Sequence, residues 1–533
     1  MGYAHEYAVA VMNRARVQME PVGFEPDWVD RPRKEKFYPD ALVFPLPAGD
    51  DGAEGSVADG CLPDRWRPDR PAPTGAFTLG ALSGMLQDSY GLVGRRLAVQ
   101  ANTDLASLPR YTHANWSRGT ASGGGLYPVS VYWVAGPSGP LTPGIYAYSP
   151  SEHAVRLLLA GDVSGEVREA LGGAAAGGPT DQYLVLGIKY WQNSFKYNSF
   201  SFHAVSMDVG TVLQTWRIWA RARGLRLDPA PLWFDEARLN RLLGVPGEEE
   251  GLFAVVPLAW DGADPAAADR PAPGVPVRHR DQERSHTVLR FDALLRMHAA
   301  TAEGAADCPA PGALEPAAAV PPRGDRIALP DPELPDVGVR EAVRARRSSF
   351  GRFDAVRPLS AAQLATALAA SAGSSVGAAA AGAGTPRLAT LYAFVNHVEG
   401  IAPGAYAYDP VAHALCLVKA GPSGAFLQRN YNLPNYNLEQ AGAVLVPAVR
   451  TTAVLDAVGD RGYRLVNATV GAVSQTFYTV ASAMGLGAGV ALGFDNLSFA
   501  EELGLDRDGE AALLIMLLGY ERPNPADFHY EIV

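Results

Sequence analysis

The sequence has few cysteines, no long hydrophobic run and no surplus of basic residues, and each absence excludes a class of protein. Its three cysteines lie far apart among 533 residues, which predicts a reducing cytoplasm and no disulfide framework. No apolar run approaches the roughly 18 residues of a membrane span, and the N-terminal residues resemble no signal peptide. A net charge of −11 argues against nucleic acid and anionic membranes as partners. No residues have the spacing of a zinc site.

What the chain does have is the composition of a large globular protein. It is 48% hydrophobic and 19% charged, and its length predicts several domains. Residues 298–336 are poor in aromatics and rich in Ala, Pro and Gly, which is typical of a linker. Residues 1–74 are interpreted as an N-terminal extension, in which 50–73 is a predicted surface loop and 11–19 a predicted helix.

The same pattern occurs on both sides of that linker. PGAYAYDPVAHALCLV at 403–418 matches PGIYAYSPSEHAVRLL at 143–158 at nine of sixteen positions, 260 residues later. VGTVLQTW at 209–216 is similar to VGAVSQTF at 470–477 within a long apolar helix. A period this long predicts two copies of one α+β domain, 75–297 and 337–533, arranged as an intramolecular pseudo-dimer.

A glycine-rich turn distinguishes the first copy. WSRGTASGGGLYP at 116–128 runs directly into the predicted strand VSVYWVAG. Its glycines allow the backbone to approach a flat or anionic group, although a flexible loop has the same composition. The matching place in the second copy, 377–389, has no such turn. The first copy also has the pair Lys196 and Tyr197, which the second copy lacks.

A cluster of arginines and serines distinguishes the second copy. RARRSSFGRF at 344–353 stands, in our interpretation, just before a helix, where guanidinium groups, hydroxyls and helical N–H groups suit a phosphate. A solvated basic surface would have the same sequence. Neither copy therefore holds a full set of site residues, but together they hold one, which predicts a single composite site between them. Tyr431 and Tyr436, in NYNLPNYN, are interpreted as a surface loop.

These residues resemble the FMN-dependent nitroreductase superfamily and, within it, the SagB-type azoline dehydrogenases, in a tandem-duplicated form as in thiopeptide biosynthesis. The resemblance spans roughly 75–265 and 337–524 and implies one bound FMN. It implies catalytic roles for Lys196 and Tyr197, and cofactor binding by Arg346, Arg347, Ser348, Arg352, Arg118, Ser122, Gly123, Gly124, Gly487, Gly489 and Arg522. Ala121 replaces the proline usual in the family's turn, and Arg522 stands where the family usually has a basic pair.

The resemblance implies oxidation of peptide thiazolines or oxazolines to azoles during the maturation of a ribosomally made peptide antibiotic. Lys196 or Tyr197 would remove the proton, and FMN would accept the hydride and be reoxidised by oxygen. The implied partners are an azoline-bearing precursor peptide and a cyclodehydratase. Two alternatives stay open: an NAD(P)H-dependent reductase of nitro or quinone compounds, and a flavin-less scaffold of a peptide-modifying complex.

Overall fold

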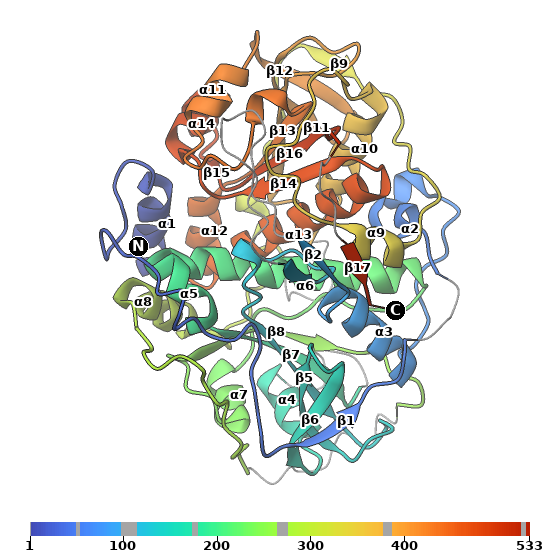
Figure 1. Ribbon diagram of the computed structural model, residues 1–533, viewed down its shortest axis with the longest axis vertical. Coiled ribbons are helices and arrows are strands. Elements are labelled where there is room, and N and C mark those ends of the chain that lie inside the picture. The colour runs from blue at the N-terminus through green and yellow to red at the C-terminus, as the bar shows by residue number, and fades with distance from the viewer. Residues whose placement is uncertain are drawn as a thin grey trace.

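The structure is a computed structural model that describes residues 2–49, 54–97, 114–172, 180–263, 275–376, 386–523 and 529–532. Residues 377–385, most of the segment that the sequence sets against the glycine-rich turn, lie outside these ranges. Figure 1 shows two lobes, one above the other, with long helices between them. We call the lobe built on strands β1–β8 the first lobe and the one built on β9–β16 the second lobe.

The first lobe contains a six-stranded antiparallel sheet in the order β1-β6-β5-β4-β7-β8. Residues of β7 and β8 are buried along both strands, because helices and loops cover both faces. The strands are β1 (Leu42–Pro45), β4 (Val129–Ala135), β5 (Gly144–Ser149), β6 (Ala154–Ala160), β7 (Gln182–Lys189) and β8 (Glu250–Pro257). Residues 143–158 of the sequence repeat form the hairpin of β5 and β6, and the predicted strand after the glycine-rich turn is confirmed as β4.

The second lobe repeats this strand order. Its sheet runs β9-β12-β11-β10-β13-β16-β14, with β15 beside β13. Both hairpins carry a register irregularity at the same place, at Ile145/Tyr146 and at Ala405/Tyr406. The strands are β9 (Arg326–Ala328), β10 (Ala389–Val395), β11 (Gly404–Asp409), β12 (Ala414–Ala420), β13 (Ala443–Val449), β14 (Gly487–Ala491), β15 (Ala511–Ala512) and β16 (Ile515–Gly519). The predicted linker contributes strand β9 to the edge of the second sheet, in the position that β1 has in the first sheet.

The helices α3 and α10, which correspond in the two lobes, each begin with a hydroxyl side chain as N-cap. The Thr78 side chain accepts a hydrogen bond from the N–H of Ala81 at the start of α3 (Leu79–Ser89). Ser360 and Gln363 form a capping box at the start of α10 (Ala361–Ala372). The other helices are α1 (Tyr3–Asn13), α2 (Val57–Cys61), α4 (Ser164–Ala170), α5 (Trp191–Tyr197), α7 (Glu236–Leu243), α8 (Asp292–Ala302), α9 (Val339–Ala345), α11 (Gly424–Arg429), α12 (Thr451–Val458) and α14 (Asn496–Leu503).

Two 22-residue helices, α6 (Ser201–Ala222) and α13 (Gly462–Ala483), lie between the lobes (Figure 1). Almost all their residues are buried, as expected of helices packed on every side. Gly210 of α6 packs against Ala468 of α13, and Gly471 of α13 packs against Met207 of α6. This contact is reciprocal, as in a two-fold interface, because the sequence repeat pairs Gly210 with Gly471 and Met207 with Ala468.

A buried ion network also joins the lobes. Arg461 and Arg464, which precede and begin the helix α13, donate to Glu236 Oε2 at 2.8 and 2.9 Å. All three side chains are at most 2% exposed. The two guanidinium groups lower the pKa of Glu236 although its burial acts the other way. A third sheet, β17-β2-β3, pairs β17 (His529–Glu531) with β2 (Gly94–Leu97) beside β3 (Ala114–Ser117).

The structure differs from three local predictions. The helix predicted at 11–19 is α1, which ends at Asn13, and the predicted loop at 50–73 contains α2. Ser56 accepts from the N–H of Asp59, so this short helix has an N-cap that the surrounding Gly, Asp and Pro obscure. The arginine cluster follows α9, which ends at Ala345, and α10 begins only at Ala361. Among the described residues, no helix is long and apolar enough to cross a membrane.

Candidate functional site

The glycine-rich turn of the first lobe is anchored on a buried carboxylate of α6. Ser122 Oγ donates to Asp208 Oδ2 at 2.6 Å, and the Gly123 N–H donates to Oδ1 at 2.9 Å. Ser122 Oγ also accepts from the N–H of Tyr127 at 2.8 Å. Burial raises the pKa of Asp208 to about 7, although the two donors favour its charged form. Two predicted site residues, Ser122 and Gly123, are therefore held by a residue that the sequence analysis missed.

The second lobe holds the same turn from the other side. Gln475 of α13 accepts from the N–H of Ala121 at 2.9 Å. Arg346 Nε donates to the carbonyl of Gly119 at 2.8 Å, and its Nη2 donates to the carbonyl of Arg118 at 3.1 Å. The structure thus brings residues predicted from the two copies together, but Arg346 binds backbone carbonyls of the turn. Its role as a phosphate ligand stays a prediction.

Lys196 and Tyr197, at the end of α5, lie directly over the turn. Gly124 has φ +64°, and a Cβ atom on it would lie 2.5 Å from Tyr197 Oη and 2.8 Å from Lys196 Nζ. Lys196 Nζ also lies 4.7 Å from the centroid of the Tyr197 ring. Both side chains are half-buried. Only glycine allows this approach, so the turn and the Lys-Tyr pair form one chemical unit.

The remaining predicted arginines gather around one carboxylate of the second lobe. Arg347 Nη1 donates to Glu521 Oε1 at 2.8 Å, and Arg352 lies 3.7 Å from the same carboxylate. Arg352 Nη2 donates to the Arg522 carbonyl at 3.3 Å, and the Arg522 N–H donates to the Arg352 carbonyl at 2.7 Å. Burial acts to raise the pKa of Glu521, but Arg347, Ser349 and Arg352 lower it. Guanidinium groups suit a phosphate, but the next helix, α10, begins only at Ala361, and the phosphate site stays a prediction.

Two tyrosines of the second lobe lie beside Ser348 and Gly489, one of the two glycines predicted in β14. Ser348 Oγ lies 2.9 Å from Tyr478 Oη. A Cβ on Gly489 would lie 2.4 Å from the Tyr436 ring, and one on Gly487 would lie 2.9 Å from Ser349 Oγ. These glycines therefore pack against side chains of their own lobe, and their predicted contact with a flavin stays untested.

The loop NYNLPNYN exposes residues 432–434 at the surface, as predicted, but buries its two tyrosines in this cluster. Tyr431 and Tyr436 are 7% and 2% exposed. Burial raises the pKa of Tyr431, and the nearby phenols of Tyr197 and Tyr478 raise it further. The signal that the sequence analysis undervalued was two tyrosines in a short loop, since amphipathic rings are often buried with the hydroxyl bonded. Here Tyr431 donates to Asn435 Oδ1 at 2.6 Å.

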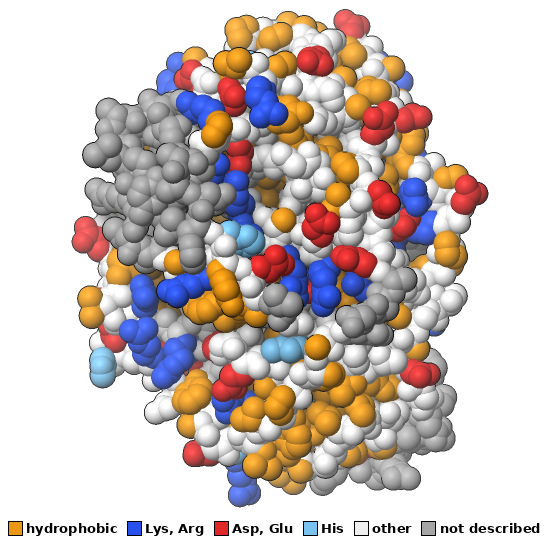
Figure 2. Space-filling view, turned by 45° about the vertical axis from the view of Figure 1, so that its right-hand side comes forward, with side chains coloured by type: hydrophobic (Ala, Val, Ile, Leu, Met, Phe, Trp, Pro, Cys, Tyr) orange, Lys and Arg blue, Asp and Glu red, His pale blue; other side chains and the backbone are white. Residues whose placement is uncertain are grey.

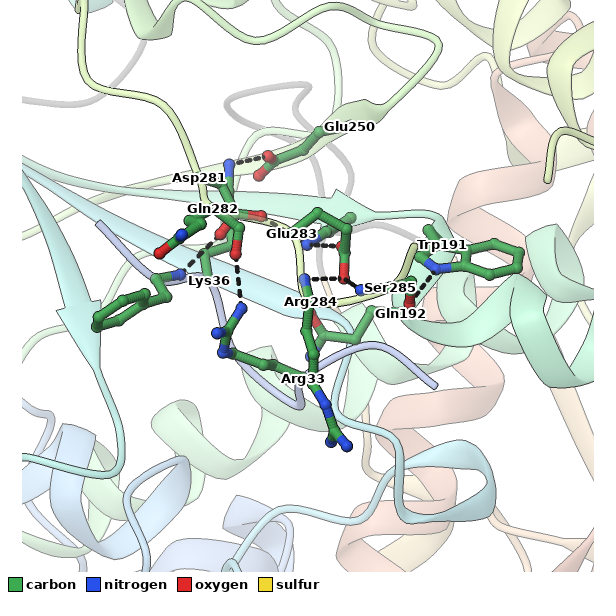
Figure 3. A network of polar contacts seen from close by, with 12 residues as sticks. Arg33, Lys36, Trp191, Gln192, Glu250, Asp281, Gln282, Glu283, Arg284 and Ser285 are labelled. Atoms are coloured by element: carbon green, nitrogen blue, oxygen red, sulfur yellow. Dashed lines mark hydrogen bonds and ion pairs between the residues drawn. The ribbon is translucent and has the colours of Figure 1, made fainter. Parts of the chain in front are cut away.

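A network of polar contacts attaches the N-terminal extension to the first lobe (Figure 3). Lys36 Nζ pairs with Glu250 Oε2 at 2.5 Å. Arg33 donates to the carbonyl of Gln282 at 2.6 Å, and the Gln282 N–H donates to the Phe37 carbonyl at 2.8 Å. On α5, Trp191 Nε1 donates to Ser285 Oγ at 2.9 Å. The extension is thus fixed beside the helix that carries Lys196.

A cavity of about 210 Å³ lies in the second lobe, between α10, β10 and α13. Thr469 lines it at the position that matches Asp208 in the repeat. Its lining also includes Val376 and Pro386, the neighbours of a segment outside the described residues, and none of the predicted site residues. We therefore assign no site to it. Among the described residues, no group of His, Cys, Asp and Glu could hold a metal ion.

Comparison with known proteins gives a partial family assignment. Residues 343–520 match the model of the Nitroreductase family. A putative nitroreductase from Anabaena variabilis ATCC 29413 aligns with a TM-score of 0.70 at 20% identity, covering 98% of this chain and 100% of that chain. The E. coli microcin synthetase McbBCD complex aligns at 20% identity over 33% of this chain and 69% of that chain, with a TM-score of only 0.28. No curated protein sequence matches. The chain therefore has a nitroreductase-like fold, and part of its second lobe is similar to the Nitroreductase family.

Proposed function

We propose that this protein oxidises peptide thiazolines or oxazolines to the aromatic azoles, with one FMN bound between its two lobes. The lobes would act as the two subunits of a pseudo-dimer, residues 75–297 supplying the turn and residues 337–533 the arginines. The observation that carries the proposal is the position of Lys196 Nζ and Tyr197 Oη over Gly124. A nitroreductase that lacks this pair would have no general base at the turn.

The cofactor would be held by both lobes. Arg347 and Arg352, which pair with Glu521 in the structure, would bind the phosphate together with Arg522. The backbone at Gly124 offers a surface without a side chain, against which an aromatic ring system can lie. When bound, FMN supplies the two-electron chemistry by accepting a hydride. The protein supplies the position of the substrate and the route of the proton.

The proton leaves the ring carbon between the C=N bond and the carbonyl group, where the resulting negative charge is delocalised. Either Tyr197 or Lys196 would receive it, and the other would polarise the acceptor through their close approach. General-base catalysis typically contributes about 10²–10⁴-fold in rate. The half-buried position of both side chains leaves them accessible to a substrate. The expected partners are an azoline-bearing precursor peptide and a cyclodehydratase that makes it.

The test separates chemistry from cofactor binding. The protein is purified, its visible spectrum recorded, and an azoline peptide offered. The double variant Lys196→Ala/Tyr197→Phe should keep the flavin spectrum and lose at least about 10²-fold in turnover. Arg347→Ala should lose flavin, and Lys419→Ala, on the exposed side of β12, should change neither property.

Three outcomes contradict the proposal. Unchanged turnover in the double variant removes the pair from the chemistry. Rapid NADPH oxidation without action on azoline peptides indicates the reductase of nitro or quinone compounds. A colourless protein that does not bind added FMN indicates the scaffold.

A further inference from the structure

We propose that the N-terminal segment 28–34 forms, with Arg118 and Lys196, a subsite for a carboxylate group of the peptide substrate. This inference rests on the proposed function, because it places the subsite beside the Lys-Tyr pair. It assigns to the extension a direct part in choosing the substrate. A subsite of this kind would favour peptides that carry an acidic group close to the azoline ring.

The first observation is that the segment has a fixed position. Besides its ion pair with Glu250, Lys36 donates to Tyr132 Oη at 2.7 Å. The Phe37 N–H donates to Asp281 Oδ1 at 2.7 Å, and Lys189 pairs with the same aspartate at 2.5 Å. Lys36 and Lys189 thus each pair with an acidic side chain, Glu250 and Asp281 respectively. The network holds the chain on both sides of Lys34, but these two acids are already paired with other lysines.

The second observation is that Lys34 stands among cations. Its side chain is accessible to solvent. Partial burial lowers its pKa to about 8, and the positive charges of Arg118, Arg31 and Lys196 lower it further. Gathering these cations costs free energy that a bound anion would recover. A negatively charged ligand would therefore stabilise the cluster.

The third observation is an unpartnered donor inside this cluster. Arg118 is 4% exposed and lies between the rings of Tyr90 and Tyr127, at 4.6 and 4.4 Å from their centroids. Its Nη2 donates to the carbonyl of Lys34 at 3.0 Å. Its Nη1 is buried and has no hydrogen-bond partner among the described residues. A buried guanidinium nitrogen without an acceptor is uncommon, and a carboxylate oxygen would satisfy it.

An aromatic wall completes the subsite. Trp28 is 49% exposed, and its ring meets that of Phe195 edge to face at 5.3 Å. Lys196 Nζ lies 5.8 Å from the Trp28 ring. An exposed indole beside accessible amines suits a peptide, which presents both apolar and charged groups. The arginines around Glu521 are a separate cluster in the second lobe and are the expected phosphate ligands.

Three fluorescently labelled azoline peptides test the proposal with the flavin-loaded protein. One has Asp next to the ring and an amidated C-terminus, the second has Asn and an amidated C-terminus, and the third has Asn and a free C-terminal carboxylate. We expect the protein to bind the first or the third peptide about tenfold more tightly than the second, as measured by anisotropy. Which of the two it prefers identifies the source of the carboxylate.

Variants connect that preference to the subsite. Lys34→Met should reduce the preference to about twofold or less, and Lys34→Arg should restore it. The matched control is Lys419→Met, a lysine of the second lobe that pairs with Glu502, and it should leave the preference intact. Thermal unfolding of each variant checks that the fold is retained.

Each possible result decides the question. Equal binding of all three peptides, or a preference that Lys34→Met does not change, overturns the subsite. A loss of NADPH affinity in Lys34→Met, with the peptide preference intact, also overturns it. If no peptide is oxidised but the Lys34-dependent preference is measured, the proposed chemistry fails and the subsite stands.

Discussion

Gly210 of α6 packs against the carbonyl oxygen of Ala468 in α13, so closely that a Cβ atom on Gly210 would lie 1.9 Å from that oxygen. The reciprocal contact, from Gly471 to the carbonyl oxygen of Met207, would have a Cβ at 2.0 Å. The helix backbones therefore touch at this crossing. Since both contacts involve backbone atoms, neither lobe can yield without moving its central helix.

The first prediction follows from this crossing. Gly210→Ala should destabilise the protein by about 1–3 kcal/mol or more, because the added methyl group forces α6 and α13 apart. Thermal unfolding measures the effect. The control is Gly424→Ala in α11, where the nearest atoms would lie 3.6 Å from the new Cβ. An equal loss of stability in both variants would contradict the prediction.

The second prediction concerns the contact of Gly124 with the Lys-Tyr pair. Gly124→Ala should lower turnover by at least about 10²-fold, because the methyl group would displace Tyr197 Oη and Lys196 Nζ. Gly125→Ala is the matched control: it has the same φ of +64°, but nothing lies within 4 Å of its Cβ position. Both variants therefore have the same backbone strain, but only Gly124→Ala has a steric clash with the Lys-Tyr pair. Equal activity of the two variants would show that the contact is irrelevant.

The third prediction is a pH dependence from Asp208. Its pKa is raised from 3.8 to about 7 in the folded protein, so the folded state keeps this proton to a higher pH than the unfolded state. The free energy of unfolding should therefore fall as the pH rises from about 4 to 7, by at most about 4 kcal/mol from this group. Asp208→Asn should remove that part of the slope, as measured by urea unfolding at several pH values. Identical slopes for the two proteins would contradict the assignment.

The fourth prediction concerns the ion network between the lobes. Glu236→Gln should destabilise the protein by about 3–5 kcal/mol, because Arg461 and Arg464 would be left buried without a counter-charge. The pKa of Glu236 is lowered from 4.5, so its stabilising effect should persist at neutral pH and be lost only in acid. Chemical denaturation measures both effects, with the exposed Glu399→Gln as control. A variant as stable as the control would be inconsistent with this network.

The fifth prediction tests the arginine cluster as a phosphate site. Glu521→Gln should tighten the binding of FMN by about tenfold, because Arg347 and Arg352 would no longer be neutralised by a carboxylate. Quenching of flavin fluorescence measures the affinity. Weaker binding in this variant would mean that Glu521 positions the arginines and does not compete with the phosphate.

The repeated strands and helices could be predicted from the sequence because their signals are local. Hairpin residues, helix caps such as Thr78 and Ser360, and the apolar pattern of the long helices all lie within short windows. Lys196, Tyr197 and the glycine-rich turn were predicted to belong to one composite site, but their direct contact is known only from the structure. Composition alone would not have joined residues so far apart in the chain.

The anchors of the site could not be predicted, because they act across the fold. Asp208 in the sequence is one acid in an apolar helix, and only the packed structure shows Ser122 and Gly123 donating to it. Gln475 likewise bonds to Ala121 across the two lobes. The arginine cluster was predicted to stand just before a helix, but Arg346 directly follows one. This prediction was wrong because a run of arginines and serines has no periodicity that shows where a helix begins or ends.

The two central helices carry different residues at matching positions: Asp208 in α6 stands where Thr469 stands in α13. An enzyme assembled from two identical chains must encode both walls of its pocket in one gene segment, so every mutation is expressed twice. In this chain the two lobes are encoded separately, so a mutation changes one side of the pocket and leaves the matching side unchanged. Selection can therefore shape an asymmetric pocket for an asymmetric molecule such as a peptide, which has a direction along its chain.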